Sequence, residues 1–214
     1  SRQAGQRNAQ HQGYALMSLA VVDSGGANIA SVMQALGRLG AEASFTSDPA
    51  TIENADRVIL PGVGSAGAAM DKLRSTGLDK LIPTLTQPVL GICLGMQLLF
   101  RRSTESDIPM LGIIEADVDR LPDAPGLRIP HMGWNQVNIQ RPDPLLEGLE
   151  DGWFYFVHSY AAPLGDWTLA SSEHGQAFSA VVQQGNFRGA QFHPERSATS
   201  GARLLKNFLE LPCN

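Results

Sequence analysis

The chain has 214 residues, 43% of them hydrophobic and 17% charged, and its formal net charge is −5. This composition is typical of one globular domain with a sizeable core. Lysine and arginine form no cluster, which argues against nucleic acid or an anionic membrane as a partner. No apolar stretch is long enough to cross a bilayer.

The two cysteines, Cys93 and Cys213, lie far apart and form no disulfide framework. Such cysteine use favours a reducing cytoplasm as the compartment. Neither cysteine belongs to a C-x-x-C pair or to a Cys/His ligand cluster, so we expect no metal site and no cofactor.

Residues 1–16 are polar, have no hydrophobic periodicity and lack the apolar core of a signal peptide. We interpret them as a leader or an extension outside the fold. Residues 17–214 are then expected to form a single domain.

Apolar strands alternate with helical patterns in the first half of that domain. We predict strands at 19–22, 43–46, 57–60 and 89–92, and helices at 28–39 and 70–85, the latter with breaks near Gly77 and Pro83. The strands are apolar throughout rather than at every second residue. This pattern is typical of a parallel sheet covered on both faces.

The second half has strand patterns with no long helix between them. They lie at 113–121, 134–139, 153–159, 168–172, 179–184 and 187–192. Gly185 and Asn186 indicate a hairpin turn between the last two, and an amphipathic helix is predicted at 198–211. The sequence therefore predicts a single-domain α/β fold with a mixed, largely parallel sheet flanked by helices.

The most informative segment is VLGICLGMQLLF, residues 89–100. It reads as a buried strand, a turn flanked by glycine and the start of a helix, with Cys93 at the bend. G-x-C-x-G is the sulfur counterpart of the nucleophile elbow, in which a sharp strand-to-helix turn exposes the nucleophile. Small flanking residues are needed because the bent backbone leaves little room, and a helix N-terminus favours a thiolate. The alternative is a buried structural cysteine.

The segment QFHPE, residues 191–195, supplies partners for a thiol nucleophile. His193 and Glu195 stand two apart at the end of an extended segment, so both side chains can point the same way. Cys93 would attack, His193 would shuttle the proton, and Glu195 would orient the imidazole and stabilise its charge. A surface histidine followed by a solvated glutamate is the alternative, but the buried strand before it favours the relay.

The segment PGVG, residues 61–64, directly follows a buried strand. Sites in open α/β sheets form at the carboxyl ends of the strands. An amide near Val63 and Gly64, together with the Leu94 N–H, would form an oxyanion hole for a tetrahedral intermediate. A plain tight turn is the alternative.

Two other segments carry histidine. FYFVHSY, residues 154–160, is typical of an aromatic-rich core strand, with His158 as a structural histidine. The same interpretation applies to His131 in PHMGWN, residues 130–135. His174 has no context that suggests a role.

Together, P-G-x-G, G-x-C-x-G-x-Q and a late H-P-E resemble the class I, or triad, glutamine amidotransferases. CLGMQLLF, HMGWN and YFVHSY are further similar to the glutaminase subunits of imidazole glycerol phosphate synthases, from histidine biosynthesis. The resemblance extends over residues 18–214 and implies a flavodoxin-like fold.

This resemblance implies hydrolysis of L-glutamine to glutamate and ammonia through a γ-glutamyl thioester on Cys93, with His193 as acid and base. It implies a glutamine pocket formed by Gly64, Leu94, Gln97, Glu105, Ser159 and Tyr160. Gln97 and Glu105 would suit the α-carboxylate and α-amino ends of a free amino acid.

The resemblance also implies a heterodimer in which ammonia passes to a separate (β/α)8 cyclase subunit. The residues expected at the docking face are Asn28, Trp134, Asn135, Tyr155 and Arg196. The family often has lysine at the position of Arg196, and arginine could pair bidentately with a partner carboxylate. The family's glutaminase is weak alone, and a peptide flip beside Val63 would complete the oxyanion hole when the liganded partner docks.

Three alternatives stay open. The chain could serve a different synthase, such as one of an anthranilate, GMP or pyridoxal-phosphate pathway. It could be a free-standing cysteine hydrolase that accepts γ-glutamyl peptides, or a catalytically idle scaffold. Intact Cys93, His193 and Glu195 argue against the scaffold.

Overall fold

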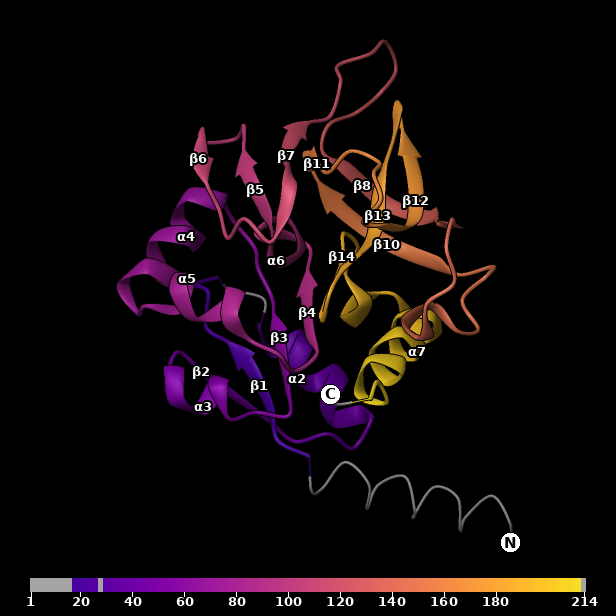
Figure 1. The fold of residues 1–214 in the computed structure, drawn as a ribbon. Helices are drawn as coiled ribbons and strands as arrows, with labels where there is room; N and C mark the ends of the chain where they lie inside the picture. Colours follow the sequence, from indigo (N-terminus) through magenta and orange to yellow (C-terminus); the bar gives the residue numbers. More distant parts are fainter. Residues whose placement is uncertain (1–16, 27–28, 213–214) are drawn as a thin grey trace, which may run out of the picture.

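The structure is a computed structural model that describes residues 17–26 and 29–212, so the expected leader at 1–16 and Asn28 lie outside the described residues. An eight-stranded sheet runs through the molecule in the order β2-β1-β3-β4-β14-β13-β12-β9 (Figure 1). Neighbours from β2 to β14 in this order are parallel, and those from β14 to β9 are antiparallel. The strands are β1 (Leu19–Val22), β2 (Ala43–Thr46), β3 (Arg57–Leu60), β4 (Val89–Ile92), β9 (Asn138–Ile139), β12 (Thr168–His174), β13 (Gln176–Gln184) and β14 (Phe187–Ala190).

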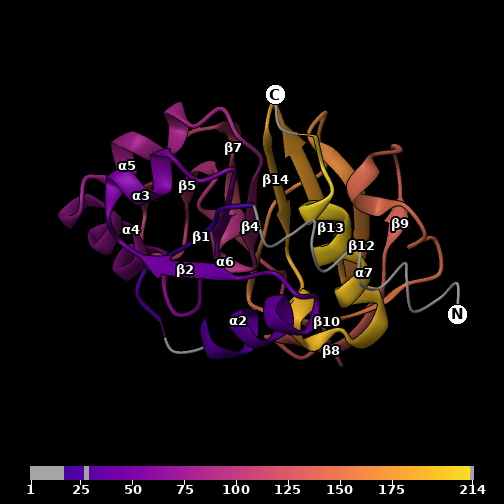
Figure 2. The same ribbon diagram turned by 90° about the horizontal axis from the view of Figure 1, so that it is seen from below.

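Helices cover both faces of the parallel half because its strands are apolar on both sides. Val21 of β1 belongs to a buried cluster with Leu36 of α2 and Leu204 of α7, whereas Val22 belongs to a second cluster with Leu73 of α4. Figure 2 shows α2 and α4 on opposite sides of β1. The helices are α2 (Ile29–Arg38), α3 (Pro49–Glu53), α4 (Ala66–Ser75), α5 (Leu78–Leu81), α6 (Leu94–Gln97) and α7 (Ala198–Leu209), with short 3-10 turns at Ile82–Thr84, Pro144–Leu146 and Pro194–Arg196.

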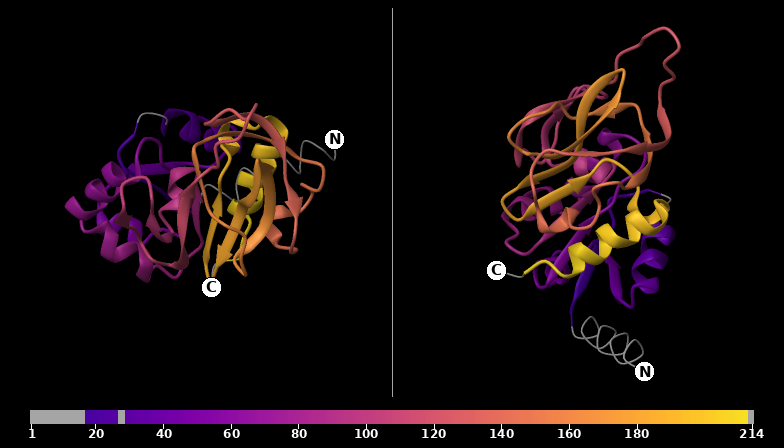
Figure 3. Two further views of the ribbon diagram at one scale, coloured as in Figure 1. Left: turned by 90° about the horizontal axis from the view of Figure 1, so that it is seen from above. Right: turned by 90° about the vertical axis from the view of Figure 1, so that its right-hand side faces the viewer.

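Two smaller sheets complete the fold. One has the strand order β11-β7-β5-β6, and the other pairs β8 with β10 in antiparallel register. Viewed from above, the helices of the first half lie on one side and the strands of the second half on the other (Figure 3). The strands of these sheets are β5 (Phe100–Ser103), β6 (Ile108–Pro109), β7 (Ile114–Arg120), β8 (His131–Gln136), β10 (Trp153–His158) and β11 (Tyr160–Ala161).

The predicted α/β class, the mixed sheet and the hairpin at Gly185 are confirmed: β13 and β14 are antiparallel, and Gly185 has a φ of +59°. The strand predicted at 134–139 is in fact two strands in different sheets, β8 and β9. The helix predicted from residue 70 begins at Ala66, because Ser65 caps it by accepting from the Ala68 N–H. The short elements α3, β5, β6 and β11 are missing from the prediction because each is too brief to show a period.

A buried histidine pair joins β8 and β10. His158 Nδ1 lies 2.8 Å from the Tyr160 carbonyl oxygen, and His158 Nε2 lies 2.9 Å from His131 Nδ1. Because a carbonyl only accepts, His158 donates from Nδ1 and accepts at Nε2, and His131 is the donor to it. His131 also stacks on His174, with ring centroids 4.2 Å apart. Both histidines of the pair have the structural role expected for them.

The two buried rings resist protonation. Burial, with a contribution from the charge of His174, lowers the pKa of His131 from 6.5 to about 4. Burial lowers the pKa of His158 to about 3 despite the opposing effect of its hydrogen bond to the Tyr160 carbonyl oxygen, and the charges of neighbouring histidines add to the lowering. Both imidazoles are therefore neutral in the folded protein near neutral pH.

We expect the free energy of unfolding to fall as the pH is lowered from 6.5 toward about 4. The unfolded chain takes up protons at these histidines in that range, whereas the folded chain does not, so their stabilising effect is complete above 6.5 and is lost in acid. Each withheld proton contributes a slope of about 1.4 kcal/mol per pH unit. His158→Gln should lower the slope of the free energy of unfolding against pH by about the contribution of one proton. Urea unfolding measured across this pH range tests this.

Phe178→Leu is the matched control, because Phe178 packs against the same ring with centroids 5.0 Å apart and carries no ionisable group. It should lower stability at every pH and keep the wild-type slope. A His158→Gln variant with the wild-type slope would contradict the assignment.

Candidate active site

A strained turn presents the candidate nucleophile. Cys93 follows β4 with a φ of +53°, a region that non-glycine residues rarely adopt. A Cβ at Gly95 would lie 1.7 Å from the Leu60 carbonyl oxygen, and one at Gly91 would lie 2.6 Å from the Gly95 oxygen. The elbow therefore needs glycine on both sides of Cys93, as the sequence predicted.

The helix that follows the elbow is shorter than expected. α6 contains only the four residues Leu94–Gln97, and the chain enters β5 at Phe100. A single turn aligns few peptide dipoles, so the macrodipole that we expected to favour a thiolate is small here. Side chains around Cys93 carry that role instead.

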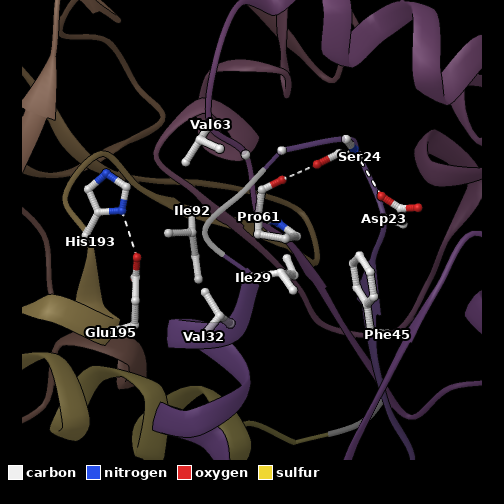
Figure 4. A pocket seen from close by; sticks show the side chains of 13 residues that line it. Asp23, Ser24, Ile29, Val32, Phe45, Pro61, Val63, Ile92, His193 and Glu195 are labelled. Carbon is white, nitrogen blue, oxygen red and sulfur yellow. Dashed lines mark hydrogen bonds and ion pairs between the residues drawn. The ribbon is translucent and has the colours of Figure 1, made fainter.

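His193 and Glu195 form a buried pair beside Cys93. His193 Nδ1 lies 2.8 Å from Glu195 Oε1, and only 7% and 2% of the two side chains are exposed (Figure 4). Burial alone would lower the pKa of His193, but the hydrogen bonds and negative charges of Cys93 and Glu195 outweigh it and raise that pKa to about 10. His193 is therefore protonated in the resting site. An imidazolium at this position favours a thiolate and holds the proton that a leaving group needs.

Glu195 is oriented toward this histidine alone. Its second oxygen, Oε2, is buried and has no hydrogen-bond partner among the described residues. A small cavity of about 20 Å³ lies beside the pair, and Ile92 and Val63 line it with them (Figure 4). The carboxylate charge is thus directed at the imidazolium, which is the orienting role that the sequence predicted.

One cavity brings most of the expected site residues together. It has a volume of about 390 Å³ and opens at Cys93. This volume is within the range of small-molecule sites. The lining residues are Val63, Gly64, Cys93, Leu94, Gln97, Glu105, Pro130, Val157, His158, Ser159, Tyr160, His193 and Arg196. All six residues implied for the glutamine pocket are among them.

Hydrogen bonds define what Gln97 can offer to a ligand. Its Nε2 donates to the Tyr160 carbonyl oxygen at 2.9 Å and to Gln191 Oε1 at 3.0 Å. Both amide hydrogens are thereby used, and only the Gln97 oxygen can face a ligand. An acceptor suits the α-amino group of an amino acid, whereas we expected Gln97 to meet the α-carboxylate.

Glu105, another lining residue of the same cavity, is anchored by hydrogen bonds. Its Oε2 accepts a hydrogen bond from the Ala66 N–H at 2.8 Å, at the start of α4. The backbone N–H of Glu105 donates to the Ser103 hydroxyl at 3.2 Å. A fixed carboxylate and the Gln97 residue in one cavity make it suited to an ammonium group.

The PGVG segment is held at one end and open at the other. The Ser24 hydroxyl donates to the Pro61 carbonyl oxygen at 2.6 Å (Figure 4). A Cβ at Gly62 would lie 2.9 Å from the Gly95 nitrogen, whereas one at Gly64 would meet nothing within 4 Å. The Leu94 N–H lies in the first turn of α6, where amides have no partner within the helix. The expected oxyanion residues thus all line the cavity.

Two of the residues expected at a docking face, Tyr155 and Arg196, lie beside His193. The Arg196 guanidinium stands 4.6 Å over the Tyr155 ring, and Trp134, half exposed, meets the same ring edge-on. The Asn135 amide donates to the Glu173 carbonyl oxygen at 3.0 Å. Asn28 lies outside the described residues. The His193 N–H donates to the Tyr155 carbonyl oxygen at 2.9 Å, so Tyr155 is joined to the candidate catalytic histidine by one backbone hydrogen bond.

Sequence reasoning missed one residue that contacts the thiol. Gln191 is fully buried, and its Nε2 lies 3.8 Å from Cys93 Sγ. Gln191 directly follows a buried strand and stands just before the His-Pro-Glu segment. This position is a signal that could have identified it.

In the described part of the chain, no group of three or more His, Cys, Asp or Glu side chains could hold a metal ion. None of the helices in that part is long and apolar enough to cross a membrane.

The chain is similar to known proteins over nearly its whole length. The family described as glutamine amidotransferase class-I matches residues 20–211. The imidazole glycerol phosphate synthase subunit HisH of Escherichia coli strain K12 is 54% identical over 197 residues, which are 91% of this chain and 100% of that protein. The HisH subunit of Xylella fastidiosa strain Temecula1 is 52% identical and covers 92% of this chain and 98% of its own length.

Solved structures agree with the fold. A crystal structure of a glutamine amidotransferase matches with a TM-score of 0.70 and 26% identity, over 90% of this chain and 97% of that one. A glutamine amidotransferase from Thermotoga maritima matches with a TM-score of 0.62 and 18% identity, over 90% of this chain and 82% of that one, and supports the fold alone. The family match and the identity over nearly the full length show that this chain belongs to the class-I glutamine amidotransferases and, among them, to the HisH subunits of imidazole glycerol phosphate synthase.

Proposed function

We propose that the protein hydrolyses L-glutamine to glutamate and ammonia, in the cytoplasm, as the glutaminase subunit of an imidazole glycerol phosphate synthase. The observation that carries this proposal is the single cavity that holds Cys93, His193 and all six residues of the implied glutamine pocket. Full-length similarity to HisH subunits assigns the pathway, histidine biosynthesis.

The site geometry supports a thioester mechanism. The Cys93 thiolate attacks the side-chain carbonyl carbon of glutamine, and the carbonyl oxygen becomes an oxyanion that accepts from the Leu94 N–H and an amide at Val63 or Gly64. His193 gives its proton to the nitrogen, so that ammonia leaves and a γ-glutamyl thioester forms. His193 then removes a proton from water, the hydroxide oxygen attacks the thioester carbon, and glutamate and the Cys93 thiolate are released.

Two lining residues of the cavity would orient the substrate. The Glu105 carboxylate and the Gln97 oxygen would accept from the α-ammonium group of glutamine. The substrate side chain would then extend toward Cys93, and a glutamine residue within a peptide chain, whose α-nitrogen is an amide, would fit poorly. These contacts favour a free α-ammonium group, which glutamine and γ-glutamyl peptides both carry.

The β8–β10 sheet supplies a face for a partner. Its solvent side carries Met132, Trp134 and Trp153, which are 63%, 50% and 51% exposed, and Arg196 lies beside it on the Tyr155 ring. Apolar side chains gathered on one exposed face are typical of a protein interaction site. We propose that a cyclase subunit of the (β/α)8 type docks here as a heterodimer and receives the ammonia.

A free-standing γ-glutamyl hydrolase and a glutaminase for another synthase are the competing functions. The first would work without a partner and would accept γ-glutamyl peptides. The second would copurify with a different synthase. The similarity to HisH subunits over the whole chain favours the proposed synthase over both.

Glutaminase activity should depend on the partner. The chain alone should turn over glutamine slowly, and addition of the cyclase with its nucleotide should accelerate it by about a hundred- to a thousandfold, the effect of one oxyanion-hole donor. Glutamate release measured in an enzyme-coupled assay tests this. Cys93→Ser, assayed in the same complex, should lose activity in both states.

Equal rates with and without the partner would contradict the proposed dependence. Rapid hydrolysis of γ-glutamyl peptides by the chain alone would favour the free-standing hydrolase. Glutamine-dependent activity that survives in Cys93→Ser would favour the scaffold.

Trp134→Ala should weaken association with the cyclase by at least about tenfold in Kd, since exposed aromatic side chains carry much of the binding energy at interfaces. Titration calorimetry with the purified cyclase measures it. Leu164→Ala is the matched control, because Leu164 is 49% exposed, close to the 50% of Trp134, and lies outside the β8–β10 sheet. Equal affinities for the two variants would contradict docking at this face.

A further inference from the structure

Gln191 occupies a position that the mechanism above does not use. It follows β14, and the pairing of Ala190 with Ile92 across β14 and β4 brings it level with Cys93. The Cys93 N–H donates to the Ala190 carbonyl oxygen at 2.8 Å, so the two chain segments are in direct contact there. Gln191 is fully buried, although glutamine is among the residues most often found at the surface.

The orientation of its amide follows from its neighbours. The Tyr160 carbonyl oxygen can only accept, so the atom of Gln97 that lies 2.9 Å away is the nitrogen. That nitrogen also lies 3.0 Å from the Gln191 side chain, whose facing atom is therefore the acceptor Oε1. The remaining atom, Gln191 Nε2, points at Cys93 Sγ from 3.8 Å.

We propose that Gln191 donates a hydrogen bond to the Cys93 thiolate, which holds the sulfur in its attacking position and connects it to Gln97 on the glutamine side of the cavity. A donor bonds an ionised acceptor about twice as strongly as a neutral one. Full burial removes competing water and strengthens the bond further. The inference rests on the proposed glutaminase function, since it assigns a further role in the same site.

The geometry distinguishes this role from simple filling of the core. A buried amide that served only to satisfy Gln97 would need its oxygen alone, and an unpartnered N–H would be costly. Gln191 instead uses both ends of its amide: Oε1 accepts from Gln97, and Nε2 donates to Cys93. The Val157 carbonyl oxygen lies 3.7 Å from the same sulfur, and it can accept from a thiol but cannot stabilise a thiolate.

Several other groups act on the thiolate and stay in place in the test. The titratable and charged side chains that line the cavity with Cys93 are Glu105, His158, Tyr160, His193 and Arg196, and Glu195 is bonded to His193. The proposal concerns the added effect of a neutral donor on top of these charges.

The test is the pH dependence of Cys93 alkylation by iodoacetamide in the full chain, with Cys213→Ser so that Cys93 is the only thiol. Gln191→Met keeps the size of the side chain and removes the donor. It should raise the midpoint of the rate profile by about one pH unit, which corresponds to loss of one hydrogen bond to a charged group. In the complex with the cyclase it should lower kcat by about tenfold.

Gln97→Met is the matched control, because it removes the other end of the contact and leaves the Gln191 donor. It should raise KM and leave the alkylation midpoint at the wild-type value. A Gln191→Met profile that overlays the wild type would overturn the proposal. If Gln191→Met fails to fold, Gln191→Asn, which keeps a buried amide but is one methylene too short to span both contacts, decides in the same way: a raised midpoint supports the proposal and an unchanged one overturns it.

The alkylation readout needs no glutamine. If the complex has no glutaminase activity, the proposed function fails, and the midpoint still shows whether Gln191 acts on the thiolate.

Discussion

The close crossing of the nucleophile elbow and the end of β3 is the constraint on which the site depends. The Leu60 carbonyl oxygen occupies the place that a Cβ at residue 95 would take, at 1.7 Å. A Cβ at Gly91 would lie 2.6 Å from the Gly95 oxygen, within the backbone of the same turn. Backbone packed this closely leaves no alternative path for the chain, so it can hold Cys93 at a positive φ that would otherwise be unfavourable. The strain is confined to this turn. The packing of the two strands beneath the turn offsets its cost.

The rest of the chemistry reaches the elbow through sheet pairing. β14 is parallel to β4 although almost 100 residues separate them, and the segment after it brings both Gln191 and His193 to the thiol. β10 approaches from outside the sheet, where the Tyr155 carbonyl oxygen accepts from the His193 N–H and the Tyr155 N–H donates to Ser197. The base is thus fixed by backbone bonds before its side chain is considered. Because the backbone is fixed here, the two-residue spacing of His193 and Glu195 is enough to direct both side chains toward the same point.

Local patterns predicted the parts of this site that depend on local geometry. The elbow, the H-P-E relay and the parallel strands follow from glycine spacing and from strands that are apolar on both faces. The contacts of Gln97 and Gln191 could not be predicted in this way, because they depend on which strand lies beside β4. For the same reason the sequence predicts one strand where the structure has β8 and β9. One run of alternating residues does not show that the chain changes sheets at Val137. α6 likewise has only one turn because the chain then enters β5. No local stop signal in the sequence predicts this length.

The arrangement also limits where a partner can change the rate. The thiol, the imidazolium and the carboxylate are already in contact, and Ser24 holds the oxyanion segment at Pro61. Freedom is left at Val63 and Gly64, where the glycine has open space around it. Val63 in turn touches the turn before α2, since a Cβ at Gly26 would lie 2.7 Å from its side chain. A displacement of Gly26 would therefore reach Val63 by direct contact, without passing through the elbow.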